Sequence, residues 1–457
     1  MTVEAGTDAA DGTSTEVTAA SGSDDGFRVR LVLVALGALA LRLVLQRFEP
    51  LPPSSKVLAD EVWYVRVAHN VLEGRGFMSP YYPLSHAPTA LHGPLTVLLL
   101  LPATLLQPHG YTAQRATMAV LGALAVVAIG YAGREIAGAR VGLIAAVLAA
   151  IYPGLWVNDL VATSETTAVL LLSVVVALSL RYRRAPSTSG VVLLGLATGL
   201  LALDRAELAL LALVLIVPAV LAASKASGAT AAGAARGLLV VVVLAVCVVV
   251  PWSAYNEARF HRSVFISNNF GQTLLGANCP ESYYGPLTGY DGRTCFLPVL
   301  AQAERTLPKG SSEADFDAYF RRHAISYATS HWHRWPVVAV MRELWLWSLW
   351  RPGWTVFMSG IYIGRAQWIA WSQIVAFWLL TPLALYGFFV ARRRRVPVAP
   401  LVTMVVFTAV LGLLVVGHLR YRIPAEIAWV LLGAIAVDRL AFGAPDSVDA
   451  TRAERSV

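Results

Sequence analysis

The sequence GLLVVVVLAVCVVVPWSAY, residues 237–255, decides the fold class because it contains no charged residue and is long enough to cross a membrane. About 20 apolar residues in a helix span the roughly 30 Å of hydrocarbon in a bilayer. Backbone polar groups in lipid must be hydrogen-bonded within their own segment, so this stretch is predicted to be a helix. Similar segments recur along the 457-residue chain, which is 57% hydrophobic and only 14% charged. The sequence therefore predicts an all-α, polytopic membrane protein, and it argues against a disordered or nucleic-acid-binding protein.

Working outward from this stretch, we predict a bundle of about ten transmembrane helices, with nine to twelve as the range. The predicted spans are 29–48, 113–133, 141–157, 164–181, 189–203, 206–222, 237–255, 367–390, 397–417 and 423–441. Short basic clusters follow alternate spans, for example at 181–184 and 392–395. Because such clusters favour the cytoplasmic side, we expect a multi-pass plasma-membrane protein with a cytoplasmic N-terminus.

Two tails are expected to flank a transmembrane domain at 27–441. Residues 1–26 contain six acidic residues and no Lys or Arg, and they are rich in Ser, Thr, Gly and Ala. This composition predicts a disordered N-terminal tail, and it lacks the basic start and apolar core of a signal peptide. Residues 442–457 are expected to form a cytoplasmic C-terminal tail.

Two long segments, 49–112 and 256–366, are predicted to lie outside the membrane and to carry short amphipathic helices. Within the second, the Trp-rich stretch 338–362 is expected to be one helix at the outer interface that does not cross. Cys279 and Cys295 lie in the same segment, sixteen positions apart. Since this segment is expected to face an oxidising compartment, the two cysteines are candidates for a disulfide.

Charged side chains recur at the predicted exterior ends of the spans, although they come from separate parts of the sequence. Ionisable groups near membrane helices are costly and therefore mark functional sites by default. Their shared level predicts an active site on the exterior face. The candidates are Asp60, Glu61, Asp159, Glu165, Asp204, Arg205, Arg420 and Arg422.

These residue types suit the transfer of a sugar from a polyprenyl phosphate to an acceptor hydroxyl. A carboxylate can act as general base, and arginines can bind the phosphate whose charge grows as it leaves. Attack from the face opposite the phosphate would invert the anomeric centre, as in inverting glycosidases. We assign Arg205 to the donor phosphate, and Asp159 and Asp204 to the surroundings of the acceptor or a metal. Carboxylates at this level could also hold Mg²⁺ or Mn²⁺, and the spacing leaves metal dependence open.

Other interpretations stay open from the residues alone. Asp60 and Glu61 could cap a helix and interact with its dipole, and Asp204 could pair with Arg205 in a tight turn. Arg42 could extend from the first span to the interface. A transporter or flippase of polyprenyl-linked sugars is the main alternative function, although it would place ionisable groups near the bilayer midplane. A non-catalytic scaffold for envelope assembly is a third.

The sequence ADEVWYVRVAHNVLEGRGF at 59–77 resembles the first exterior loop of membrane glycosyltransferases related to protein O-mannosyltransferases and lipid A aminoarabinose transferases, which are glycosyltransferase family 39-like. Four further stretches resemble the same family in the same order. They are TSETTAVLLL at 163–172, LDRAELALL at 203–211, VPWSAYNEARFHRSVFISNNFGQTLLGAN at 250–278 and GHLRYRIPAEIAWVLLGA at 417–434.

The resemblance implies the GT-C fold and a donor sugar carried on a lipid phosphate. It implies Asp60 as catalytic base, with Glu61 helping to orient the site and Glu165 near the acceptor or a metal. Arg420 and Arg422 would hold the lipid phosphate. The expected partners are a polyprenyl-phosphate-linked sugar, membrane lipids and an envelope glycan, glycolipid or protein acceptor, with no nucleic acid.

Overall fold

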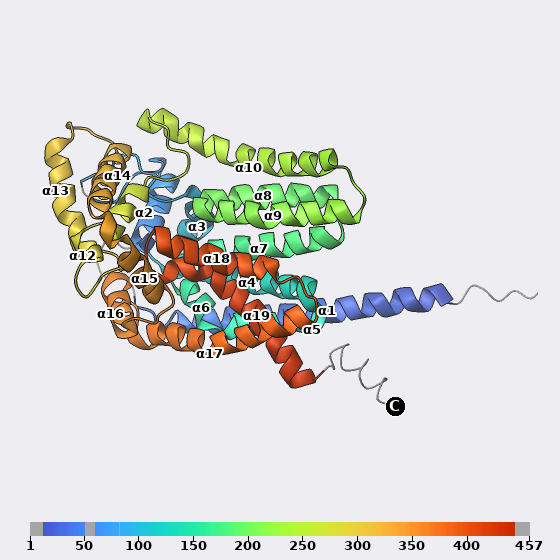
Figure 1. Ribbon diagram of the computed structural model, residues 1–457. Coiled ribbons are helices and arrows are strands. Elements are labelled where there is room, and N and C mark those ends of the chain that lie inside the picture. The colour runs from blue at the N-terminus through green and yellow to red at the C-terminus, as the bar shows by residue number, and fades with distance from the viewer. Residues whose placement is uncertain (1–11, 51–59, 82, 444–457) are drawn as a thin grey trace, which may run out of the picture.

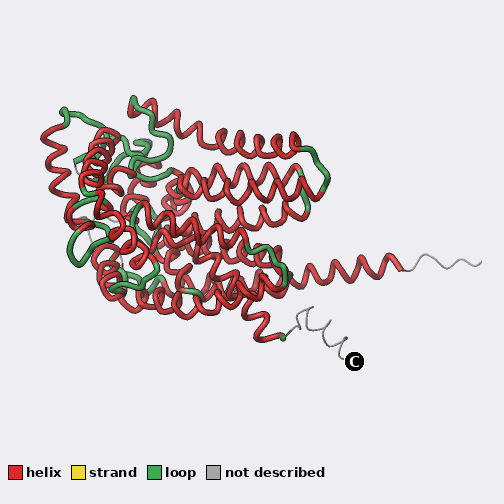
Figure 2. Tube along the Cα trace, viewed as in Figure 1, coloured by secondary structure: helices red, strands yellow, loops and turns green. Residues whose placement is uncertain are grey.

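The computed structural model describes residues 12–50, 60–81 and 83–443. Within these ranges the chain forms helices joined by loops and turns, and it contains no β-strand (Figure 2). The long helices run side by side, while α2 and α12–α16 gather at one end of the bundle, on the left in Figure 1. We call this end the loop end.

Each of the ten predicted spans overlaps a helix, and the predicted all-α polytopic fold is confirmed. Of the helices in the described ranges, five are long and apolar enough to cross a membrane: α4, α7, α9, α10 and α17. The helices that match the ten predictions are α1 (Gly12–Leu45), α4 (Thr112–Ala137), α5 (Ala139–Ile151), α7 (Ser164–Arg184), α8 (Thr188–Asp204), α9 (Ala206–Ala226), α10 (Ala231–Phe260), α17 (Gln367–Arg393), α18 (Ala399–Leu414) and α19 (Ile423–Phe442).

The predicted span 141–157 is not one straight helix. It consists of α5, the short helix α6 (Pro153–Trp156) and the 3₁₀ turn η1 (Val157–Leu160), with a bend of 57° at the break. Proline disfavours helical geometry in the residue before it, and Tyr152 before Pro153 has an extended backbone. After the bend, η1 packs against α1, α4, α7 and α17.

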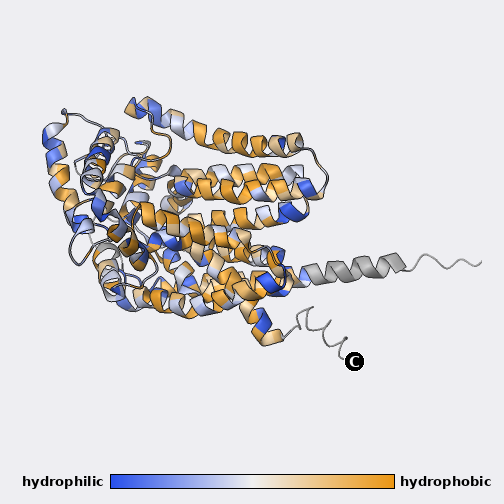
Figure 3. Ribbon diagram, in the orientation of Figure 1, coloured by the Kyte–Doolittle hydropathy of each residue, from blue (hydrophilic) through white to orange (hydrophobic). Residues whose placement is uncertain are grey.

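The hydropathy of the long helices changes along their length. Hydrophobic residues line the long helices, and hydrophilic residues concentrate toward both ends (Figure 3). The connections α4–α5, α7–α8, α9–α10 and α17–α18 lie at the end opposite the loop end (Figure 1). These connections carry the short basic clusters, so the structure separates them from the candidate site as the sequence predicts.

The loop end is built from short helices that follow or precede the long ones. The predicted single helix at 338–362 is instead two helices of 12 residues each, separated where Ser348 and Arg351 have positive φ angles. Each is too short to span a bilayer, and Trp345 is buried rather than placed at an interface. The short helices are α2 (Asp60–Leu72), α3 (Pro94–Leu106), α11 (Phe270–Ala277), α12 (Pro280–Tyr283), α13 (Phe296–Thr306), α14 (Glu313–Ser330), α15 (Trp335–Leu346) and α16 (Pro352–Ile363).

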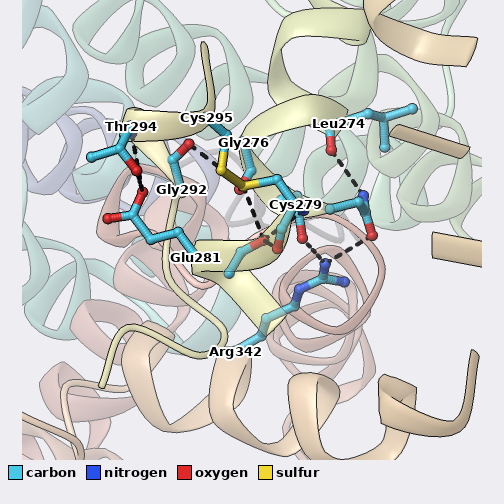
Figure 4. Close-up of a disulfide and its surroundings, with 11 residues drawn as sticks. Leu274, Gly276, Cys279, Glu281, Gly292, Thr294, Cys295 and Arg342 are labelled. Carbon is cyan, nitrogen blue, oxygen red and sulfur yellow. Dashed lines mark hydrogen bonds between the residues drawn. A yellow bond between two sulfur atoms is a disulfide. The ribbon is translucent and has the colours of Figure 1, made fainter. Parts of the chain in front are cut away.

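The predicted disulfide between Cys279 and Cys295 is present, with 6.4 Å between the two Cα atoms (Figure 4). It closes the segment between α12 and α13. Arg342 of α15 reinforces this segment by donating to the carbonyl oxygen of Ala277 at 2.7 Å and to Asn278 Oδ1 at 3.4 Å. The disulfide and these hydrogen bonds fix the segment from Ala277 to Cys295 against α15.

The N-terminal boundary differs from the prediction. Residues 12–26, expected to be disordered, belong to helix α1. Extending an existing helix costs far less than nucleating a new one, so the apolar span can propagate a helix into a polar sequence. Residues 1–11 and 444–457, where the rest of the predicted tails lie, are outside the described residues.

Candidate active site

Asp60 is the first residue of α2 and lies at the loop end beside an arginine and a histidine. Its Oδ2 atom is 2.7 Å from Nη2 of Arg420, and its Oδ1 atom is 3.5 Å from Nε2 of His92. Burial alone would raise the pKa of Asp60, but the charges of Arg420 and His92 outweigh it and hold that pKa well below its ordinary value. The carboxylate is therefore ionised at neutral pH.

Arg420 connects Asp60 to a second carboxylate, that of Glu165 in the first turn of α7. Nη2 of Arg420 lies 2.6 Å from Glu165 Oε1, and Nε donates to the same oxygen at 2.7 Å. Arg205 reaches this oxygen as well, at 3.0 Å, and its Nε lies 2.8 Å from Glu207 Oε1. We call Asp60, Glu165, Arg205 and Arg420 the acid–arginine cluster.

Every member of the acid–arginine cluster sits at the end of a helix. Asp60 and Glu165 open α2 and α7, where a carboxylate interacts favourably with the helix dipole. Arg205 separates α8 from α9, and Arg420 lies in the 3₁₀ turn η4 (Leu419–Arg422) before α19. These helix ends lie at one level of the bundle, so residues from four parts of the chain come together here.

Three recesses border the cluster. The central recess is lined by Asp60, Glu165 and Arg420 together with polar residues of α16 and α17, such as Ser359 and Gln373. The helix-end recess is lined by Arg205, Arg420, Tyr421 and Asp204 and reaches Leu411 and Val415 of α18. The aromatic recess is lined by Asp60 at one end and by Phe296, Phe316 and Phe320 at the other.

Two histidines belong to this site although the sequence analysis did not select them. His418 lines the central recess, and its Nδ1 accepts a hydrogen bond from the backbone N–H of Arg420 at 3.3 Å. Burial, with the nearby charges of Arg420 and Arg293, lowers the pKa of His418 to about 3, so its ring is neutral. His92 stacks on Tyr64 with 5.1 Å between ring centroids. The position of His418 two residues before Arg420 was the one available signal.

Glu61 does not point at the same groups as Asp60. Both of its carboxylate oxygens accept hydrogen bonds from Arg115 of α4 at 2.8 Å, and Oε1 also accepts from the backbone N–H of Ala162 at 2.9 Å. The pair is buried. Glu61 therefore anchors the start of α2 to α4 and to the segment before α7, and this holds Asp60 in position.

The structure places Asp159 away from the cluster, unlike its predicted position near an acceptor or metal. Its Oδ2 atom is 2.6 Å from Nε of Arg42, its Oδ1 accepts from Thr166 Oγ1 at 2.8 Å, and it lines none of the three recesses. Arg42 is 1% exposed, so it does not extend to an interface. A side chain at Gly122 would collide with this carboxylate, which accounts for the glycine there.

Asp204, predicted to lie near the acceptor or a metal, borders the helix-end recess, and it does not form the pair with Arg205 that was the alternative interpretation. Its Oδ1 atom accepts a hydrogen bond from Thr96 Oγ1 at 2.7 Å, and Oδ2 is buried without a hydrogen-bond partner. Thr96 in turn lies 3.0 Å from Thr167. Asp204 thus joins α3, α7 and α8 behind the cluster.

Arg422 does not have the position expected of a phosphate ligand, because its side chain is wholly buried and lines none of the three recesses. Its Nε donates to Glu426 Oε1 at 2.5 Å, its Nη1 donates to Ser348 Oγ at 3.1 Å, and its guanidinium lies 3.9 Å from the ring centroid of Phe377. Two residues along a tight turn reverse the direction of a side chain. Arg422 therefore holds η4 against α15 and α17.

The Arg422→Lys variant should test this correction. Lysine keeps the charge but loses the fixed geometry of the guanidinium, so the free energy of unfolding should fall by about 1–3 kcal/mol. The Michaelis constant for a lipid-phosphate sugar should not change. Thermal unfolding in detergent and donor titration measure the two effects. A raised donor Michaelis constant with unaltered stability would restore Arg422 as a phosphate ligand.

No protein-family model matches the sequence, and no curated protein matches it. The structure is similar to AglB, the oligosaccharyltransferase of Archaeoglobus fulgidus, solved with an inhibitory peptide and a dolichol-phosphate, at 16% identity and a TM-score of 0.53. The match covers 95% of this chain and 52% of that chain. The chain has the GT-C fold.

Two further solved structures are similar to this chain. The Archaeoglobus fulgidus oligosaccharyltransferase in complex with Zn and sulfate is 18% identical, with a TM-score of 0.50 and coverage of 90% of this chain and 50% of that chain. ArnT from Cupriavidus metallidurans, bound to undecaprenyl phosphate, is 17% identical, with a TM-score of 0.44 and coverage of 92% and 79%. This chain spans about half the length of the oligosaccharyltransferase that it matches.

The carboxylates of this GT-C chain do not fit the metal site that the sequence left open. Glu61 and Asp159 are each paired with a buried arginine, and Asp60 and Glu165 share the guanidinium of Arg420. Throughout the described ranges, no three His, Cys, Asp or Glu side chains are grouped so that they could hold a metal ion. We therefore derive no step through Mg²⁺ or Mn²⁺.

Proposed function

We propose that this protein is an inverting glycosyltransferase that moves a sugar from a polyprenyl phosphate to a hydroxyl group of an envelope glycan, glycolipid or protein. The observation that carries the proposal is the single guanidinium of Arg420, which contacts both Asp60 and Glu165. A base and a phosphate-binding cation are thereby adjacent at the level where long apolar helices end. The GT-C fold supports the same general kind of reaction.

The donor phosphate would bind in the helix-end recess. Arg205 and Arg420 both line it, and two guanidiniums can bind phosphate oxygens with paired hydrogen bonds. The recess also reaches Leu411 and Val415 of α18. Leu210 of α9 and Leu414 of α18 are 63% and 69% exposed, so the lipid chain would lie along apolar surfaces of these helices.

The proposed reaction needs no acid to activate the leaving group. The acceptor hydroxyl gives its proton to Asp60, and its oxygen forms a new bond to the anomeric carbon. The bond from that carbon to the phosphate oxygen breaks, and the lipid phosphate leaves with the electron pair. Arg205 and Arg420 stabilise the added negative charge, while attack from the opposite face inverts the anomeric centre.

Arg420 would also control the basicity of Asp60. A carboxylate whose pKa is held far below neutral is a weak base, since an efficient base has a pKa nearer the working pH. When Arg420 turns toward a donor phosphate, its influence on Asp60 weakens, and burial then raises the pKa of the carboxylate. The base would become effective only after the donor has bound.

The purified protein should be assayed with synthetic polyprenyl-phosphate hexoses and pentoses, with and without a chelator. Release of lipid phosphate and the anomeric configuration of the product, measured by NMR, are the readouts. We expect inversion and full activity in the chelator. Retained configuration would exclude direct displacement, a chelator-sensitive reaction would restore a metal, and no release from any donor would overturn the proposal.

The alternative of a transporter or flippase is less well supported. Transporters of known architecture place their ionisable groups near the bilayer midplane, whereas the acid–arginine cluster lies at helix ends. A scaffold would not require closely paired acids and arginines beside three recesses. We also propose that the cluster faces the exterior of the plasma membrane, with the N-terminus in the cytoplasm, from the positions of the basic loops.

A further inference from the structure

The aromatic recess is a second chamber that shares Asp60 with the proposed reaction site. Its walls come from α11, α13, α14 and the loop that the antiparallel bridge between Met78 and Pro88 closes, which contributes Ser79, Tyr81 and Leu84. It encloses about 730 Å³, including space open to solvent at its mouth. Because much of this space is open solvent, the recess would hold only part of a ligand, and that part could lie beside the carboxylate of Asp60.

The polar end of the aromatic recess has hydrogen-bonding groups that the protein does not use. Asp317 Oδ1 accepts from the backbone N–H of Gly271 at 2.5 Å, but its Oδ2 makes no hydrogen bond within the described ranges. The exposed amide of Gln272 likewise makes none with any described residue. One free carboxylate oxygen and one free amide thus face the chamber, an acceptor beside a group that can both donate and accept.

Glu313 also borders this end, but its oxygens are occupied. Oε2 accepts from Thr89 Oγ1 at 2.6 Å, and Oε1 accepts from the backbone N–H of Ala90 at 2.7 Å and from Asn268 at 3.5 Å. These bonds join the start of α14 to the segment before α3. Glu313 therefore fixes the wall of the recess and leaves Asp317 and Gln272 to meet a ligand.

The other end of the recess is aromatic and apolar. Phe320 contacts both Phe296 and Phe316, with ring centroids 5.5 Å and 6.3 Å apart, and Leu84 and Leu300 complete the surface. Aromatic faces carry partial negative charge and attract the slightly positive C–H groups of a ligand. This end suits a flat surface made of C–H groups.

The charge of the recess disfavours an anionic ligand. Among the described residues that line it there are three carboxyl groups, Asp60, Glu313 and Asp317, and no lysine or arginine. Burial raises the pKa of Glu313 to about 7, and Arg420 beside Asp60 is already shared with Glu165. A phosphate or carboxylate would therefore have to be desolvated here without an unpaired counter-charge, which is costly. A neutral molecule with several hydroxyl groups and an apolar face matches the remaining features.

We infer that the aromatic recess binds the acceptor, and that the acceptor is a neutral sugar ring. Its reacting hydroxyl lies at Asp60, neighbouring hydroxyls bond to Asp317 Oδ2 and Gln272, and its C–H face packs on Phe296 and the neighbouring phenylalanines. The role of this sugar as acceptor rests on the proposed function, whereas the binding of a neutral sugar does not. This selects a glycan or glycolipid among the acceptors proposed above.

Saturation-transfer NMR on the detergent-solubilised full chain tests the inference with three probes. These are methyl hexopyranosides (the mannoside, glucoside and galactoside), methyl glucuronide, and a short peptide containing Ser and Thr. We expect signal from the ring protons of at least one hexopyranoside and none from the glucuronide or peptide. Stronger binding of the glucuronide or the peptide, or no binding of any hexopyranoside, would overturn it.

Matched variants locate the binding. Phe296→Ala and Gln272→Ala should each weaken hexopyranoside binding about tenfold, as expected for losing a stacked ring or a hydrogen bond in a small site. The controls are Leu297→Ala and Gln302→Ala, exposed residues of α13 outside the recess, and both should bind normally. Equal binding in all four variants would place the sugar elsewhere and contradict the inference.

Transfer assays separate this inference from the proposed function. If hexopyranosides bind but no lipid-phosphate sugar is consumed, the transferase proposal fails and the sugar site stands. If donors are consumed and sugar is transferred to the peptide but not to hexopyranosides, the transferase proposal stands and this inference fails.

Discussion

Asp60→Asn is expected to lower sugar transfer by about three orders of magnitude while the protein remains folded. General bases typically contribute about 10²–10⁴-fold to a rate, and an amide can neither take the proton nor carry the negative charge. Asparagine has nearly the same size, so the position of α2, which Glu61 and Arg115 fix, should not change. Initial rates of lipid-phosphate release at saturating donor measure the effect.

A control on the same helical segment makes this result specific. Glu73 follows the last turn of α2 and is partly exposed, where it contacts His69 at 3.2 Å. Glu73→Gln should retain full activity because this carboxylate lines none of the recesses around Asp60. Near-normal turnover in Asp60→Asn would remove Asp60 as the base. Equal losses in both variants would indicate a disturbed helix rather than lost chemistry.

The spans could be predicted because their signal is local. An apolar run such as 237–255 needs no knowledge of its neighbours to be assigned as helix, and the structure places it within α10. The break between α5 and α6 was equally local, since Pro153 marks it, but the apolar composition of 141–157 concealed it. The extension of α1 back to Gly12 depends on helix propagation, which composition does not reveal.

The candidate site was predictable only to the level of helix ends. Asp60, Glu165, Arg205 and Arg420 meet because each lies where a helix begins or ends, which the sequence shows. The direction of a side chain depends on the turn that carries it, so nothing in the sequence distinguished Arg420 from Arg422.

Long-range pairs were beyond the sequence for a different reason. The partner of Asp159 is Arg42, which is 117 positions away, and no local pattern connects the two. A buried charge needs an opposite charge, but only the packing of α1 against α4 and η1 decides which residue supplies it. The position of His92 at the site also depends on long-range packing, because the loop that carries it lies against the start of α2.

Arg420→Ala is expected to reduce kcat/KM by about 10²–10³-fold, the usual effect of removing one group that stabilises developing negative charge. It should also change the pH dependence. With Arg420 present, the pKa of Asp60 lies well below its ordinary value, so the base stays ionised as the pH falls. Without it, only His92 opposes the effect of burial, so that pKa should rise and kcat/KM, which reports the free enzyme, should be lost at a higher pH.

The acidic limb of the pH profile distinguishes this role from a structural one. Relative to the unaltered protein, Arg420→Ala should lose more activity at pH 5 than at pH 8. The loss in Arg420→Lys should be intermediate between those of Arg420→Ala and the unaltered protein, because one ammonium cannot bridge Asp60 and Glu165 as the guanidinium does. Arg259→Ala is a suitable control, since Arg259 bonds Asn256 and backbone carbonyls and lines none of the three recesses. If Arg420→Ala kept its donor affinity and its acidic limb, Arg420 would neither hold the lipid phosphate nor set the charge of Asp60. The adjacency of base and phosphate site would then be structural, and the proposed transfer would lose its main support.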